Sequence, residues 1–123
     1  MAQHCKTRMS PSAASNKDEN PMTDLYTIFC RDRPGSRPVR MAQLSRHLSH
    51  IETVMDRIKL AAPLRDDAGE AFTGALLVIT ASSIADARAF IEADPYYQAG
   101  IWDTVEIDRL GMSAGEWVGG KSW

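Results

Sequence analysis

The sequence predicts an α+β fold with the element order βαββαβ, the split βαβ or ferredoxin-like arrangement. Four short segments are rich in β-branched, aliphatic and aromatic residues, which favour strands. Two other segments repeat apolar residues at helical spacing. Breaker-rich turns separate the segments, and right-handed crossovers then place both helices on one face of a four-stranded antiparallel sheet.

The first half of the fold holds a strand, a helix and a hairpin. We expect the first strand at 25–30, ahead of the breaker-rich segment 31–38. Strands at 58–63 and 72–80 flank a polar turn that contains Gly69, which indicates a hairpin. The helix between them carries one apolar stripe. That stripe consists of Met41, Leu44, Leu48, Ile51 and Met55.

The second half supplies the other helix and the last strand. Ser83 followed by Asp86 predicts a capping pair at a helix start. Asp94-Pro95 predicts the end of that helix, because proline disfavours helical conformation in the residue before it. Residues 104–109 alternate polar and apolar side chains, as in a half-exposed strand.

Both faces of the predicted sheet carry apolar side chains. In the first strand Leu25 and Phe29 oppose Ile28 and Cys30. Two helices cover only one face, and burial of apolar surface contributes roughly 25 cal/mol per Å². We therefore expect a homodimer that stacks sheet on sheet, since two-fold pairs dominate soluble assemblies.

Length and composition limit the chain to one domain. Residues 1–24 contain no Val, Ile, Leu, Phe, Tyr or Trp, so we expect a disordered extension over 1–23 and a folded domain over 24–123, with Met22 as an alternative start. The net charge of -2 favours neither nucleic acid nor an acidic membrane. No apolar run is long enough to cross a bilayer, and two cysteines build no disulfide framework. These features predict a reduced, cytoplasmic protein.

Two histidines lie on the first predicted helix. At 100° per residue, His47 lies roughly 80° and His50 roughly 140° from the centre of the apolar stripe. We expect His50 to face water. His47 then lies at the border of the packed surface, where an imidazole either reaches into a pocket or packs on a neighbour as an ordinary surface residue.

Three other features have both a chemical and a structural interpretation. Asp94 is either a helix stop or the carboxylate partner of a working histidine, which spacing alone does not decide. The arginines of segment 31–40, Arg40 among them, either hold an anion or are solvated. Cys30 is expected to pack as a small hydrophobe. No metal-ligand spacing, phosphate loop or nucleophile elbow is present, which predicts no metal and no cofactor.

Over residues 24 to about 110 the chain resembles the YciI-like family. The motifs that carry the resemblance are Arg46-His-Leu-Ser-His-Ile51, Asp56-Arg-Ile-Lys-Leu-Ala-Ala-Pro-Leu64, Phe72-Thr-Gly-Ala-Leu-Leu-Val-Ile79 and Ala93-Asp-Pro-Tyr-Tyr-Gln-Ala-Gly-Ile101. The resemblance implies a dimeric α+β barrel, related to muconolactone isomerases, with a pocket between helices and sheet. It also implies that His47 and Asp94 form the active pair. Ala62 and Ala75 depart from the Gly and Ser usual in the family.

Together these features predict a small cofactor-independent enzyme of lyase or isomerase type, either dehydrochlorinase-like or muconolactone-isomerase-like, acting on a cyclic or aromatic metabolite. His47 would be the general acid or base, and Asp94 would orient it. Tyr96 would donate a hydrogen bond to substrate unless it only packs, and Arg40 would bind substrate. The alternatives are a non-catalytic small-molecule-binding module and an interaction domain that uses the polar N-terminal tail or residues 111–123.

Overall fold

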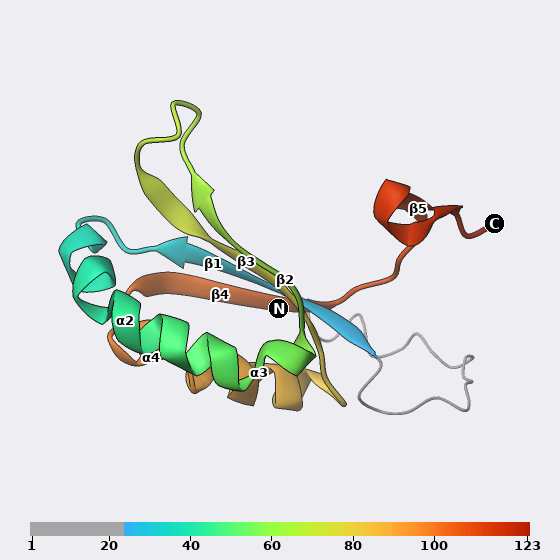
Figure 1. Ribbon diagram of the computed structural model, residues 1–123, viewed down its shortest axis with the longest axis horizontal. Helices are drawn as coiled ribbons and strands as arrows, with labels where there is room; N and C mark the ends of the chain where they lie inside the picture. Colours follow the sequence, from blue (N-terminus) through green and yellow to red (C-terminus); the bar gives the residue numbers. More distant parts are fainter. Residues whose placement is uncertain (1–23) are drawn as a thin grey trace.

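The computed structural model describes residues 24–123; the predicted extension over 1–23 lies outside the described residues. Four strands form the main sheet: β1 (Leu25–Asp32), β2 (Ile58–Arg65), β3 (Phe72–Thr80) and β4 (Trp102–Arg109). The helices are α2 (Arg37–Thr53), α3 (Ile84–Glu92) and the short α4 (Pro95–Gln98). A 3-10 turn, η3 (Met55–Arg57), leads from α2 into β2. Figure 1 shows the three helices in one layer on a single side of the sheet.

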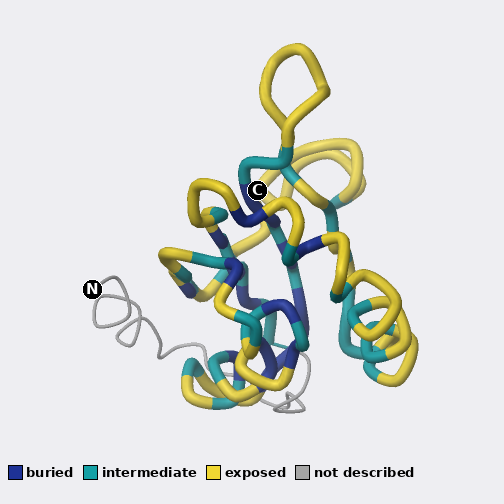
Figure 2. The backbone as a smooth tube through the Cα atoms, turned by 90° about the vertical axis from the view of Figure 1, so that its left-hand side faces the viewer, coloured by how far each residue is buried: buried dark blue, intermediate teal, exposed yellow. Residues whose placement is uncertain are grey.

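The sheet confirms the predicted α+β, ferredoxin-like fold. Its strand order is β2-β3-β1-β4, and every neighbouring pair is antiparallel. Ile28 of β1 lies opposite Leu77 of β3 and Ile107 of β4. All three side chains are buried and point to the helix side, where they pack against Phe90 and Ile91 of α3. The core therefore lies between the sheet and α3. Figure 2 shows the buried segments, in dark blue, gathered in the middle of the molecule.

Several elements begin or end beyond the predicted bounds. Helix α2 starts at Arg37, inside the segment 31–38 that was predicted to be breaker-rich, with Pro38 in its first turn, where a missing N–H costs no hydrogen bond. Pro95 follows the end of α3 as predicted, but it also opens α4, which the sequence analysis missed. After β4, strands β5 (Ala114–Gly115) and β6 (Gly120–Lys121) flank the 3-10 turn η4 (Glu116–Val118), in which Trp117 is 82% exposed. Figure 1 shows this segment projecting away from the sheet.

Helix α2 turns a different face inward from its apolar stripe. Its least exposed line of residues is rotated about 100° from the stripe, the step of one residue. That line comprises Arg40, Gln43, His47, His50 and the C-cap Val54, of which Arg40 is buried. In the stripe, Met41, Leu48 and Met55 are 48, 51 and 54% exposed. The helix packs mainly against α4 and meets the sheet through Arg40, which binds Asp32 of β1. The stripe itself therefore stays largely outside the core.

This rotation changes the expectations for both histidines. The prediction that His50 faces water is wrong: the residue is half-buried, and its Nε2 is buried without a hydrogen-bond partner among the described residues. His47 lies near the centre of the inner face, with its side chain 20% exposed, instead of at a border. The cause is that α2 packs through its polar inner face.

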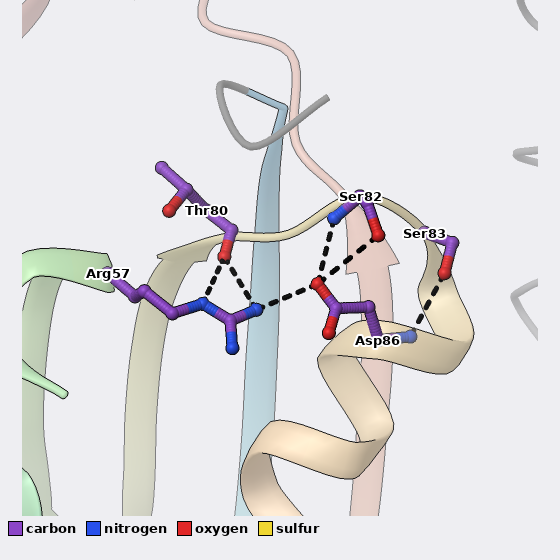
Figure 3. A network of polar contacts seen from close by, with 5 residues as sticks. All are labelled: Arg57, Thr80, Ser82, Ser83 and Asp86. Carbon is purple, nitrogen blue, oxygen red and sulfur yellow. Dashed lines mark hydrogen bonds and ion pairs between the residues drawn. The ribbon is translucent and has the colours of Figure 1, made fainter. Parts of the chain in front are cut away.

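A network of polar contacts joins the start of α3 to η3 and to the end of β3 (Figure 3). Ser83 accepts a hydrogen bond from the backbone N–H of Asp86 at 3.0 Å, as the predicted capping pair requires. Asp86 in turn accepts from the Ser82 N–H at 3.0 Å and from the Arg57 guanidinium at 2.8 Å. Arg57 also donates to the Thr80 carbonyl. One carboxylate thus fixes the helix start against the sheet.

The cap gives a test of this junction. Replacing Ser83→Ala leaves the Asp86 N–H without its side-chain acceptor, so we expect the free energy of unfolding to fall by about 1 kcal/mol. Ser82→Ala is the matched control, because the Ser82 hydroxyl makes only a 3.4 Å contact with Asp86. Urea unfolding followed by circular dichroism measures both variants. Equal losses in the two variants would contradict the assignment of Ser83 as the cap.

Cys30 packs in the core, as expected of a small hydrophobe. It is fully buried beneath the helix layer. Burial raises the pKa of its thiol to about 12, with further contributions from the negative charges of Asp94 and Asp32. The thiol therefore stays neutral at physiological pH and is no nucleophile in the folded state.

We expect the Cys30 thiol to resist a disulfide reagent at pH 8 in the folded protein and to react fully in denaturant. A Cys5→Ser background isolates this thiol. An unfolded thiol ionises near pH 8.5, so the unfolded state holds fewer protons than the folded state between that pH and about 12. Stability should therefore fall as pH rises through this window, and Cys30→Ala should reduce the fall. Rapid labelling of the native protein would contradict the assignment.

Candidate active site

A cavity of about 300 Å³ lies between the apolar stripe of α2 and strands β2 and β3. Its walls are mainly aliphatic and aromatic, and all four residues predicted for the site line it: Arg40, His47, Asp94 and Tyr96. The departures Ala62 and Ala75 line it too. A cavity of this size and lining suits a small organic ligand with one ring.

Asp94 is positioned by the short helix that follows it. It is the N-cap of α4, and its Oδ1 accepts the backbone N–H of Tyr96 at 2.8 Å, while Pro95 occupies the first helical position. Asp-Pro thus supplies both a cap and a preorganised helix start. The side chain is 1% exposed. The interpretation of Asp94 as a helix stop is therefore incomplete, because the residue ends one helix and caps the next.

The structure brings His47 and Asp94 together. His47 Nδ1 lies 2.9 Å from Asp94 Oδ1, so the same oxygen serves the helix cap and the imidazole. The His47 ring also stacks on Tyr96, with centroids 3.9 Å apart and planes 4° from parallel. With Asp94 ionised, Nδ1 is the donor, which leaves the lone pair on Nε2. The imidazole is thus fixed both in orientation and in tautomer.

The expectation that Arg40 is a solvated loop arginine is wrong. It belongs to the first turns of α2, is 5% exposed, and forms a two-pronged ion pair with Asp32 at 2.7 and 3.2 Å. Its guanidinium carbon lies 4.7 Å from the Phe72 ring centroid and 5.0 Å from that of Tyr96. A buried arginine needs such a carboxylate partner. Arg40 is therefore a structural tie between α2 and β1 that also forms part of the cavity wall.

Tyr96 lies between the imidazole and the guanidinium. Burial raises the pKa of its phenol, and the positive charge of Arg40 offsets part of that rise. The phenol stays protonated at neutral pH and can act as a hydrogen-bond donor. The Trp102 ring meets Tyr96 edge to face, with ring centroids 6.0 Å apart.

Two buried polar atoms at the cavity have no partner among the described residues. They are Asp94 Oδ2 and the indole Nε1 of Trp102. Buried polar atoms are almost always hydrogen-bonded, so an acceptor and a donor left without partners beside a cavity indicate a place where a ligand or water binds. Trp102, which precedes the predicted last strand, and Phe72 and Arg65 were not predicted to be site residues. Alternation along β4 gave no signal for Trp102, because it would place this residue on the face of Thr104 and Glu106, whereas the register shifts between Arg31 and Asp32 at that end of the strand.

Two further observations concern metals and membranes. Within residues 24–123 no group of three or more His, Cys, Asp or Glu side chains lies close enough to hold a metal ion. None of the helices formed by the described residues has the length and apolar character needed to span a membrane.

Three comparisons with known proteins point to the same family. The model of the YCII-related domain matches residues 25–110. Protein YciI of Escherichia coli O6:H1 and of Shigella flexneri are each 29% identical over 90 residues, which is 68% of this chain and 92% of theirs. The structure of 5-chloro-2-hydroxyhydroquinone dehydrochlorinase (TftG) from Burkholderia phenoliruptrix AC1100, in complex with 2,5-dihydroxybenzoquinone, is also similar. It is 28% identical, with a TM-score of 0.65 that covers 75% of this chain and 96% of that one. The chain therefore belongs to the family of YCII-related domains.

Proposed function

We propose that the protein is a small cofactor-independent enzyme that carries out acid–base chemistry of lyase or isomerase type on a cyclic or aromatic metabolite. The observation that carries the proposal is the His47–Asp94 contact of 2.9 Å at a cavity of about 300 Å³. An imidazole fixed by a buried carboxylate and facing an apolar cavity is the arrangement that general acid–base catalysis needs. Similarity to a dehydrochlorinase supports the same class of reaction.

In this proposal His47 Nε2 exchanges the proton and Asp94 stabilises the imidazolium that forms. In a dehydrochlorination the elements of HCl leave together: the base accepts a proton, and chloride departs with the electron pair of the carbon–chlorine bond. No electrons are gained or lost overall, so the step needs no redox cofactor. Tyr96 would donate a hydrogen bond to the oxygen that gains charge, and Arg40 would contribute positive potential at the same wall.

Paired variants test the proposed dyad. His47→Phe keeps a ring to stack on Tyr96 but removes the base, and Asp94→Asn keeps a good helix cap but removes the charge. We expect each to lower chloride release from 5-chloro-2-hydroxyhydroquinone by at least about 100-fold, and circular dichroism checks that each variant is folded at the assay temperature. His50→Gln, on the same helix, should retain activity.

Two outcomes would count against catalysis by this pair. Chloride release that survives in His47→Phe would contradict the role of the dyad. If 2,5-dihydroxybenzoquinone shifts the His47 resonances but the wild type releases no chloride, the non-catalytic binding module becomes the better interpretation.

The proposal includes a homodimer formed through the open face of the sheet. Leu25 and Phe29 of β1 and Leu76 and Val78 of β3 share that face and are only half-buried in one chain. The face becomes polar on β4, which contributes Glu106 and Asp108. A second copy is the simplest cover for the apolar half.

We expect the wild type to sediment as a dimer at micromolar concentration and Leu76→Asp as a folded monomer, because a charge in the centre of this face opposes stacking. Met55→Asp is the control, since Met55 is more exposed but lies in η3, outside the sheet. Analytical ultracentrifugation separates the cases. A wild type that is monomeric at every concentration would contradict the proposed dimer.

A further inference from the structure

Trp102 reaches the cavity because the pairing of β1 with β4 is irregular at its end. Farther along β4, Val105 and Ile107 pack on the core side of the sheet. Regular alternation from these residues would turn Trp102 to the open face. Trp102 lies opposite Asp32 instead, where the register shifts so that β4 contains one extra residue, Asp103. An extra residue of this kind re-aims a neighbouring side chain, and Trp102 accordingly packs against the core and lines the cavity.

Inside the cavity the Trp102 ring meets one aromatic partner at a right angle. Its centroid lies 6.0 Å from that of Tyr96, and the two planes are 87° apart. Edge-to-face pairs at this separation stabilise the relative orientation of the two rings. The indole Nε1 has no hydrogen-bond partner among the described residues. The ring contact, and not a hydrogen bond, therefore fixes Trp102 against Tyr96.

Tyr96 in turn sets the plane of the imidazole. The hydrogen bond to Asp94 fixes the position of His47 Nδ1, but the plane of the ring depends on two side-chain torsions. The Tyr96 ring limits those torsions, because it lies parallel to the imidazole with centroids 3.9 Å apart. The helix cap holds only the backbone N–H of Tyr96. The orientation of the Tyr96 ring itself must come from its side-chain neighbours.

We propose that Trp102 is a positioning residue for the acid–base pair: its edge-to-face contact holds Tyr96 in the stack that fixes the plane of the His47 imidazole. Trp102 exchanges no proton in this arrangement and acts only through Tyr96. The proposal rests on the proposed function, since it concerns the orientation of the base in the same site.

Matched replacements test the contact in the ligand-free protein. Trp102→Phe keeps an aromatic edge, whereas Trp102→Leu is apolar without one. Protons above the face of an aromatic ring resonate upfield, so NMR should show the His47 ring protons upfield of their positions in the unfolded protein. We expect this upfield shift to persist in Trp102→Phe and to be largely lost in Trp102→Leu. Trp117→Ala, an exposed position in η4, is the control and should keep the shift.

Kinetics supply the second measurement. We expect kcat for chloride release from 5-chloro-2-hydroxyhydroquinone to fall about tenfold in Trp102→Leu and to stay within about twofold of wild type in Trp102→Phe, because a misoriented base slows the proton transfer. KM, determined separately, should change little in Trp102→Leu. Circular dichroism checks folding, and Trp102→Met is the second non-aromatic variant if Trp102→Leu does not fold.

Three results would overturn the positioning role: upfield shifts that survive in the non-aromatic variants, shifts that are lost equally in Trp102→Phe, or a kinetic effect confined to KM. Failure of the proposed function has a different signature. The upfield shift would then be present in the wild type, kept in Trp102→Phe and lost in Trp102→Leu, while the wild type releases no chloride.

Discussion

The Asp94 carboxylate is the contact on which the site depends. A single oxygen, Oδ1, caps α4 and holds the imidazole of His47. The cap fixes Tyr96, whose ring stacks on the imidazole and has the Arg40 guanidinium carbon 5.0 Å from its centroid. Through this one buried group the placement of α4, the attachment of α2 and the tautomer of the histidine are linked. The helix cap and the contact with the imidazole are therefore not alternatives, since one oxygen makes both.

The strands and the α3 cap could be predicted because they follow from local rules. Residues 72–80 alternate between two faces, and Ser83 with Asp86 satisfies the first turn of α3 without help from distant residues. The hairpin between β2 and β3 follows equally from its polar turn. These features persist in the structure because tertiary packing reinforces the local preference instead of opposing it.

The placement of α2 could not be predicted, because it depends on what the helix packs against. Periodicity locates an apolar stripe but does not say whether that stripe meets a core or a cavity. Here Leu48 faces the cavity while Arg40 is buried, and the burial of Arg40 depends on Asp32 at the end of another element. The His47–Asp94 contact likewise joins residues 47 positions apart. The Asp-Pro pair did carry a signal for α4, since proline opens helices as readily as it follows them.

The exposure of the apolar stripe of α2 has a consequence for the stability of the fold. In most small domains the apolar face of a helix is covered by its own chain, whereas within residues 24–123 the stripe of α2 borders a cavity of about 300 Å³. A ligand that filled this cavity would complete the hydrophobic core. Because it would bind only the folded state, its binding would raise the free energy of unfolding, and tighter binding would hold α2 more firmly against the sheet.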